Sequence, residues 1–198
     1  LDIFLEHRRE VVTRRTVFEL RKARERGHVL EGLAVALANI DEFIEMIKNS
    51  PTPPVAKAAL MEKSWDSSLV RDMLSRAEAD TPGGRAAYRP EGLPANYGLQ
   101  TDGLYRLSDD QAQEILQMRL QRLTGLEQDK IIGEYKDVMS VIADLLDILA
   151  RPERVTTIIA DELTALKAEF GTTKLAVRRS VVEHNVQELG TEDLITPT

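Results

Sequence analysis

The side chains that most often carry chemistry are scattered through this 198-residue sequence. His7, His28 and His184 have no spacing that suggests a shared metal ion, and the chain has no cysteine to act as a ligand or nucleophile. Tyr97 and Tyr105 have no flanking base that would activate them, so we interpret both as packing or hydrogen-bonding residues. We therefore predict no catalytic residue and no metal site in this chain.

Two further patterns have a simpler explanation than chemistry. The stretch "TPGGR" at 81–85 is rich in glycine, but no predicted strand precedes it and no clear helix follows it, so we interpret it as a loop and not a phosphate-binding site. Asp109 and Asp110 with Glu114 resemble a metal-binding cluster. However, acidic residues at a helix start are explained by the helix dipole. No cofactor-binding residue is predicted.

Charge is unevenly distributed along the chain, whose formal net charge is −7. Residues 1–26 carry a net charge of +3, whereas 27–124 carry −4 and 125–170 carry −5. An acidic chain is not expected to hold nucleic acid tightly as a whole. No apolar run is long enough to span a membrane and no secretion signal is present, which favours a cytoplasmic location without a membrane partner.

The basic start of the chain has two interpretations. Its paired arginines either contact phosphates or form ion pairs with an acidic helix downstream, and the second interpretation is favoured. The residues concerned are Arg8, Arg9, Arg14 and Arg15 on the basic side and Glu134, Asp137, Asp144 and Asp147 on the acidic side.

The basic and acidic segments have matching apolar patterns. Within 1–26, apolar side chains recur every seven residues at Phe4, Val11 and Phe18, a narrow stripe that needs one partner helix. In 125–170, apolar positions alternate in steps of three and four, with a break expected at Pro152. The expected stripe is Ile131, Tyr135, Val138, Ile142, Leu145, Leu149, Pro152, Thr156, Ile159, Leu163, Leu166 and Phe170. We predict that the two segments pair in antiparallel fashion.

Between them, residues 27–124 are predicted to form a small globular head. A helix is expected over 28–49, and Thr52-Pro53 begins a short one. Residues 79–103 are expected to be mostly loop, followed by a short extended piece in "GLYRLS". Ser108 to Gln111 has the pattern of a capping box, and Thr124 to Glu127 repeats it. The predicted fold is all-α: a long antiparallel two-helix coiled coil carrying an inserted helical head, with 171–198 as a tail or linker.

Two long stretches of this sequence resemble a known family. "FLEHRREVVTRRTVFELRKARERGHVLEGLAVALANIDEFIEMI" and "DGLYRLSDDQAQEILQMRLQRLTGLEQDKIIGEYKDVM", together with "EDLIT" at 192–196, are similar to the A subunits of bacterial DNA gyrases. The region 61–100 matches no motif of this family. The A-type subunits of topoisomerase IV share the layout and are the alternative.

The resemblance implies that the chain is the coiled-coil arm and exit-gate head of a type IIA DNA topoisomerase. Two heads would then meet across a two-fold axis to form a homodimer, beneath the cavity through which a DNA duplex passes. The B subunit, ATP and Mg²⁺ belong to the full complex, and this chain alone should neither cleave DNA nor hydrolyse ATP. We also expect the acidic head to repel the transported duplex. Duplex binding by the chain at micromolar concentration in physiological salt would contradict that expectation.

We predict that the dimer contact lies on head helices near the recognised motifs. The first choice is Gln111, Ile115, Met118, Arg119 and Arg122, and the second is Ile40, Asp41 and Ile44. Methionine and arginine are enriched at protein interfaces, but the helix carrying them is equally compatible with inward packing. Two other hypotheses remain open from sequence: a coiled-coil scaffold that displays a head to another partner, and an enzyme with an unrecognised site in the head.

Overall fold

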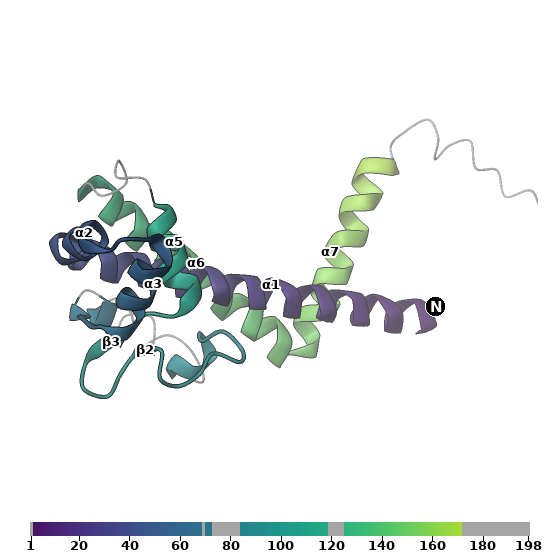
Figure 1. Ribbon diagram of the computed structural model, residues 1–198. Coiled ribbons are helices and arrows are strands. Elements are labelled where there is room, and N and C mark those ends of the chain that lie inside the picture. The colour runs from purple at the N-terminus through teal and green to yellow at the C-terminus, as the bar shows by residue number, and fades with distance from the viewer. Residues whose placement is uncertain (1, 69, 73–83, 119–124, 172–198) are drawn as a thin grey trace, which may run out of the picture. The chain divides into compact units, whose positions relative to one another are not determined.

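A computed structural model of the chain shows a helical protein with one small sheet (Figure 1). It describes residues 2–68, 70–72, 84–118 and 125–171. The named elements are α1 (Asp2–Ala38), α2 (Ile40–Asn49), α3 (Pro53–Glu62), β1 (Ser64–Asp66), η1 (Gly84–Ala87), β2 (Gly98–Leu99), β3 (Leu104–Arg106), α5 (Asp109–Gln117), α6 (Gly125–Ala150) and α7 (Pro152–Phe170). The predicted all-α class is confirmed.

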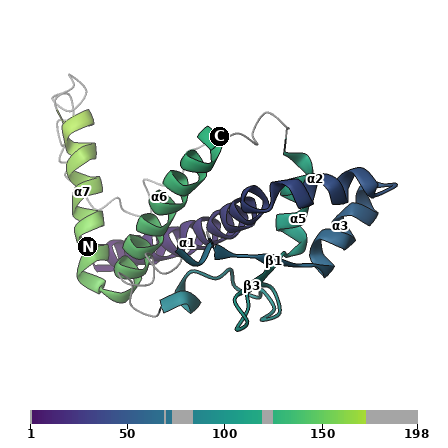
Figure 2. The ribbon, with the colours of Figure 1, turned by 90° about the vertical axis from the view of Figure 1, so that its left-hand side faces the viewer.

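The long helix α1 packs against α6, and the two run in opposite directions (Figures 1 and 2). Residues nearer the C-terminal end of α1 contact residues nearer the N-terminal end of α6. Gly27 approaches Met139 and Ile142, and Glu31 bonds to Tyr135. Arg26 pairs with Glu134 at 2.6 Å, one cross-helix ion pair of the predicted kind. The antiparallel pairing of α1 with α6 is therefore present, and its supercoiling stays a prediction.

The face of α1 that packs on α6 differs from the predicted one. Phe4, Val11 and Phe18 are 49%, 36% and 46% exposed, whereas Val12, Thr16 and Leu20 are buried. These three share a helix face with Gly27, whose neighbours belong to α6. The Thr16 hydroxyl donates to the Val12 carbonyl at 2.8 Å, which satisfies the polar atom inside the contact. The prediction that Phe4, Val11 and Phe18 mark the contact is wrong, because the buried face of α1 combines the apolar Val12 and Leu20 with Thr16 and Gly27.

Helix α6 buries most of the predicted stripe, including Ile131, Tyr135, Ile142 and Leu145. It ends at Ala150 and α7 begins at Pro152, so Arg151 alone interrupts the helices, where proline disfavours a helical preceding residue. Asp144 and Asp147 pair with Arg154, at 2.5 and 3.4 Å. Their predicted pairing with the arginines of α1 stays a prediction.

The part of α7 after residue 156 forms a separate unit of the chain. Leu163, Leu166 and Phe170 in it are 42%, 50% and 58% exposed. The predicted pairing of this part with residues 1–26 stays a prediction. The capping box expected at Thr124, and the tail from 172 onward, lie outside the described residues.

The head is built around the second half of α1, which continues without a break past the predicted end near residue 26. Its core includes Leu30, Leu33 and Val35, and α2, α3 and α5 gather at this end of the helix (Figure 2). The predicted helix over 28–49 is divided at Asn39, whose side-chain amide donates to the carbonyls of Val35 and Asp66.

A three-stranded antiparallel sheet in the order β1-β3-β2 completes the head. The extended piece predicted in "GLYRLS" is its central strand, and Tyr105 lies opposite Trp65 on one side and Leu99 on the other. Helix α3 begins after Thr52 with proline in its first turn, as predicted. Helix α5 has the predicted capping box, with Ser108 and Gln111 bonded in both directions.

Two glycines of α1 provide a matched test of helix packing. A Cβ added to Gly27 would lie 2.9 Å from Met139 Cε, the end of a flexible side chain, whereas one on Gly32 would lie 2.8 Å from both Cβ and Cγ of Gln111. Alanine favours a helix over glycine by about 1 kcal/mol. We expect Gly27→Ala to leave the free energy of unfolding unchanged or higher, and Gly32→Ala to lower it by about 1–3 kcal/mol. Urea unfolding followed by the fluorescence of the single tryptophan, Trp65, measures both, and equal effects would contradict the packing described here.

Candidate protein–protein interface

An apolar groove of about 260 Å³ lies between α2 and the C-terminal end of α5. Its lining side chains come from α1, α2, α5 and the residue that follows α5, and all but one are apolar. They are Ala36, Ile40, Phe43, Ile44, Ile47, Lys48, Ile115, Leu116 and Met118. The groove therefore brings together residues from both predicted choices for the dimer contact, although the two segments lie about seventy positions apart in the sequence.

The floor of the groove is fixed by the core of the head. Ala36, Phe43 and Ile115 are each at most 5% exposed. The Phe43 ring stacks on Trp65 with centroids 3.9 Å apart, and the Trp65 indole donates to the Leu60 carbonyl at 2.9 Å. A floor held in this way is preformed, so a partner would lose little free energy in ordering it.

The rim of the groove is accessible. Ile40, Ile44, Leu116 and Met118 are half-buried, and Ile47 is 37% exposed. Helix α2 places its three isoleucines and Phe43 on the groove face, while Asp41, Glu42 and Glu45 are exposed. An apolar depression surrounded by charged side chains is the usual anatomy of a protein–protein contact.

The structure places the predicted contact residues in three different situations. Ile115, Met118, Ile40 and Ile44 line the groove, and Asp41 is exposed beside it. Gln111 is fully buried, so a second chain cannot reach it, and this part of the prediction is corrected. Its amide is required inside the head, where it bonds to other buried groups. Arg119 and Arg122 lie outside the described residues.

Gln111 belongs to a buried polar cluster that the sequence did not reveal. Its Nε2 donates to the His28 carbonyl at 2.6 Å and to the Tyr105 hydroxyl at 2.7 Å. His28 Nε2 lies 2.7 Å from Ser108 Oγ, and Gln111 Oε1 accepts from the Ser108 amide at 3.0 Å. The capping box of α5 is thus connected to α1. The capping motif at 108–111 was a signal for the helix start, but nothing in the sequence pointed to His28 as its partner.

The cluster changes the acid–base properties of its members. Burial, followed by the positive charge of Arg89, lowers the pKa of His28 from 6.5 to about 4. Burial and the nearby Glu31 carboxylate raise the pKa of Tyr105 well above its ordinary value. Both groups are therefore uncharged at neutral pH. Tyr105 has no role as a nucleophile in this arrangement, because its hydroxyl is buried and hydrogen-bonded.

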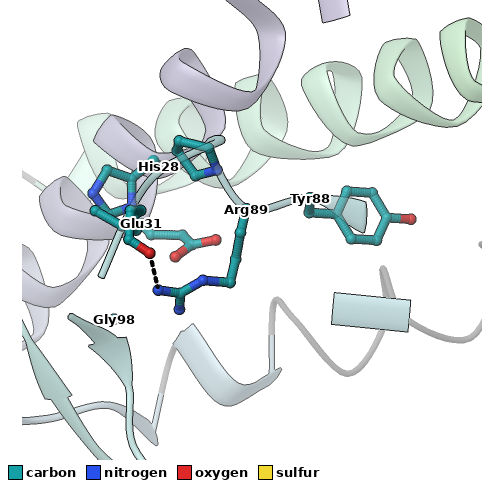
Figure 3. A pocket seen from close by; sticks show the side chains of 7 residues that line it. His28, Glu31, Tyr88, Arg89 and Gly98 are labelled. Atoms are coloured by element: carbon teal, nitrogen blue, oxygen red, sulfur yellow. Dashed lines mark hydrogen bonds between the residues drawn. The ribbon is translucent and has the colours of Figure 1, made fainter. Parts of the chain in front are cut away.

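Arg89 lies in the loop next to this cluster and bonds to three carbonyls of the same loop. Its guanidinium donates to the carbonyls of Tyr97 and Pro94 at 3.1 and 3.0 Å and to that of Leu93 at 3.5 Å, and Figure 3 shows it opposite His28 and Glu31. Arg24 adds a bond to the Ala87 carbonyl at 2.8 Å and a pair with Glu91 at 2.9 Å. Arg24 therefore fixes this loop, which was predicted without regular structure, to α1, whereas Arg89 connects one part of the loop to another.

Two other kinds of site are absent from the part of the chain that the structure describes. No three histidine, aspartate or glutamate side chains there come together as metal ligands. Within the same residues, no helix has the length and apolar character needed to cross a membrane.

Comparison with known proteins agrees with the resemblance carried by the two long sequence stretches. A family model that describes the A subunits of DNA gyrase and topoisomerase IV matches residues 1–164. The chain is 53% identical over 196 residues to the DNA gyrase A subunit of Pseudomonas aeruginosa, covering 99% of this chain and 20% of that protein. The corresponding protein of Aeromonas salmonicida is 51% identical over 197 residues, which is 100% of this chain and 20% of the relative. The corresponding protein of Neisseria gonorrhoeae is 50% identical over 195 residues, which is 98% of this chain and 20% of that protein.

The chain spans about a fifth of the length of these relatives. The match includes the region 61–100, which had no recognisable motif, because the alignments run through nearly all of the chain. The family model alone covers well over half of it. This chain belongs to the family of DNA gyrase and topoisomerase IV A subunits.

Proposed function

We propose that this chain forms the arm and the exit-gate dimerisation head of a DNA gyrase A subunit. The observation that carries the proposal is the 53% identity to a gyrase A subunit over 99% of the chain. Gyrase is preferred over topoisomerase IV because the relatives named above are gyrase A subunits. In the complete enzyme, this part would serve ATP-dependent double-strand passage together with the B subunit.

The groove between α2 and α5 is proposed as the contact for a second copy of this chain. A two-fold contact presents the same surface on both copies, so the groove and its apolar rim side chains would each occur twice in it. A gate that opens and closes should have a smaller contact area than a permanent, core-like interface. The groove residues Ile47 and Met118 are exposed or half-buried apolar side chains that the contact would cover.

The antiparallel helices α1 and α6 support the role of the arm. A pair of packed helices is stiffer than a single one, and the 37 residues of α1 extend over roughly 55 Å at 1.5 Å per residue. Helix α1 also enters the core of the head without a break, so the head is carried on a continuous rod.

Small-angle scattering with mass determination tests the proposal. We expect a mass of twice 22.2 kDa and a particle in which two heads meet and the arms diverge. Association of the arms side by side into a rod would instead indicate a coiled-coil scaffold, because the helix contact would then lie between chains. A monomer at all concentrations up to the millimolar range would refute the dimerisation role.

A further inference from the structure

Glu31 lies where three parts of the protein meet. It belongs to α1, and its carboxylate accepts two hydrogen bonds from different elements. Oε2 accepts from the Tyr105 hydroxyl of β3 at 2.8 Å, and Oε1 accepts from the Tyr135 hydroxyl of α6 at 3.1 Å. Figure 3 shows Glu31 beside His28 on the α1 side of a small pocket, facing Arg89 of the loop.

Both tyrosines are rigidly held. Tyr105 is fully buried in the central strand of the sheet, and its hydroxyl also accepts from Gln111. Tyr135 is 1% exposed in the contact between α6 and α1. Because neither ring can move freely, the two hydrogen bonds to one carboxylate fix the distance between the sheet and α6.

This bridge connects elements that otherwise make little contact. Within the described residues, α6 packs extensively against α1 alone, and β3 packs extensively against its neighbouring strands. A hydrogen bond to a charged group is stronger than one between neutral groups. Glu31 therefore provides a strong polar connection between the sheet of the head and the second helix of the arm.

We propose that Glu31 is a positioning residue that fixes the orientation of the head on the α1–α6 helix pair. It acts through Tyr105 and Tyr135. The consequence of this inference rests on the proposed function. A head held firmly on its arm would transmit movements of the arm to the exit gate.

The absence of native cysteine makes the test direct, since two introduced cysteines carry the only labels. Ala58→Cys on α3 and Ser140→Cys on α6 are at exposed positions of the head and the arm. Spin labels at both report the distribution of distances between them. Diluting the labelled chain into excess unlabelled chain restricts the measurement to one copy, so the result does not depend on dimerisation.

Tyr135→Phe and Glu31→Gln each weaken the bridge with little change of shape. We expect both to broaden the distance distribution, and to speed hydrogen exchange of the sheet amides by about 10-fold or more, the factor that corresponds to 1.4 kcal/mol. The effects of the two changes should be less than additive in the double variant, because both act on the same hydrogen bond. Glu134→Gln is the matched control, since it removes the neighbouring ion pair with Arg26 and leaves the bridge intact.

A distribution as narrow in Tyr135→Phe and Glu31→Gln as in the control would overturn the inference, as would fully additive effects of the two changes. If either single variant fails to fold, as judged by Trp65 fluorescence, the other supplies the measurement. Failure of the proposed dimerisation would show separately, as a monomeric mass in scattering, while these distances within one chain remained interpretable.

Discussion

Lowering the pH from 7 to 4 is expected to reduce the free energy of unfolding by about 3 kcal/mol through His28 alone. In the unfolded chain the imidazole binds its proton near pH 6.5, whereas in the folded chain its pKa is about 4. Between these values the unfolded state holds more protons, so stability is lost as the pH falls through this range. A difference of one pKa unit corresponds to about 1.4 kcal/mol.

Two features of the structure cause this effect. His28 is 6% exposed, so a charged imidazolium would lose its hydration, and Arg89 adds a like charge nearby. The ring is also positioned by Ser108 and Gln111, which leaves little room for the cluster to rearrange around a proton. Acid should therefore loosen first the contact between α1 and the start of α5.

Urea unfolding at a series of pH values, at fixed protein concentration, measures the effect through Trp65. The variant His28→Gln cannot titrate and should show a flatter profile between pH 4 and 6.5, although its stability at pH 7 will be lower. His7→Gln is the matched control, because His7 is exposed on the same helix. If His28→Gln has the same pH dependence as the unchanged chain, His28 is not the responsible group.

Local signals in the sequence were sufficient for several elements of the fold. The capping box at Ser108, the proline start of α3 and the interruption before Pro152 each depend on neighbouring residues and are present in the structure. The apolar stripe of α6 was recognisable because large side chains form it at regular spacing. Such features require no knowledge of distant parts of the chain.

Features that depend on distant contacts were not predictable in the same way. The contact face of α1 uses Thr16 and Gly27, and neither contributes to a hydrophobic pattern. Gln111 was predicted at the dimer contact because its helix lies near the recognised motifs, but its hydrogen bonds to His28 and Tyr105 compensate for its burial. The groove itself forms only because the tertiary fold brings α2 beside the end of α5.

The largest effect on assembly is expected from a negative charge in the groove. Ile44→Glu and Met118→Glu place a carboxylate in the proposed contact at half-buried positions, where the monomer can still hydrate it. Ile115 is less suitable, because at 5% exposure a glutamate there would be buried in the folded head itself. The choice of position thus separates a defect in association from a defect in folding.

Each substitution appears twice in a two-fold contact, so its cost is doubled. An unpaired carboxylate that loses its hydration costs several kcal/mol, and each 1.4 kcal/mol is tenfold in the dissociation constant. We therefore expect either variant to raise the dimer dissociation constant by about 100-fold or more. Analytical ultracentrifugation should show a monomer at concentrations where the unchanged chain is a dimer.

Val55→Glu is the matched control for this experiment. Val55 is an apolar residue of α3 that is 48% exposed and lies outside the groove, so the variant has the same added charge on the same head. It should remain a dimer. The Phe43–Trp65 stack beneath the groove provides the folding control, since the fluorescence of Trp65 should be unchanged in all three variants. Dimers of equal strength in Ile44→Glu, Met118→Glu and Val55→Glu would place the gate contact on another face of the head, because a carboxylate cannot be buried in an apolar contact without weakening it.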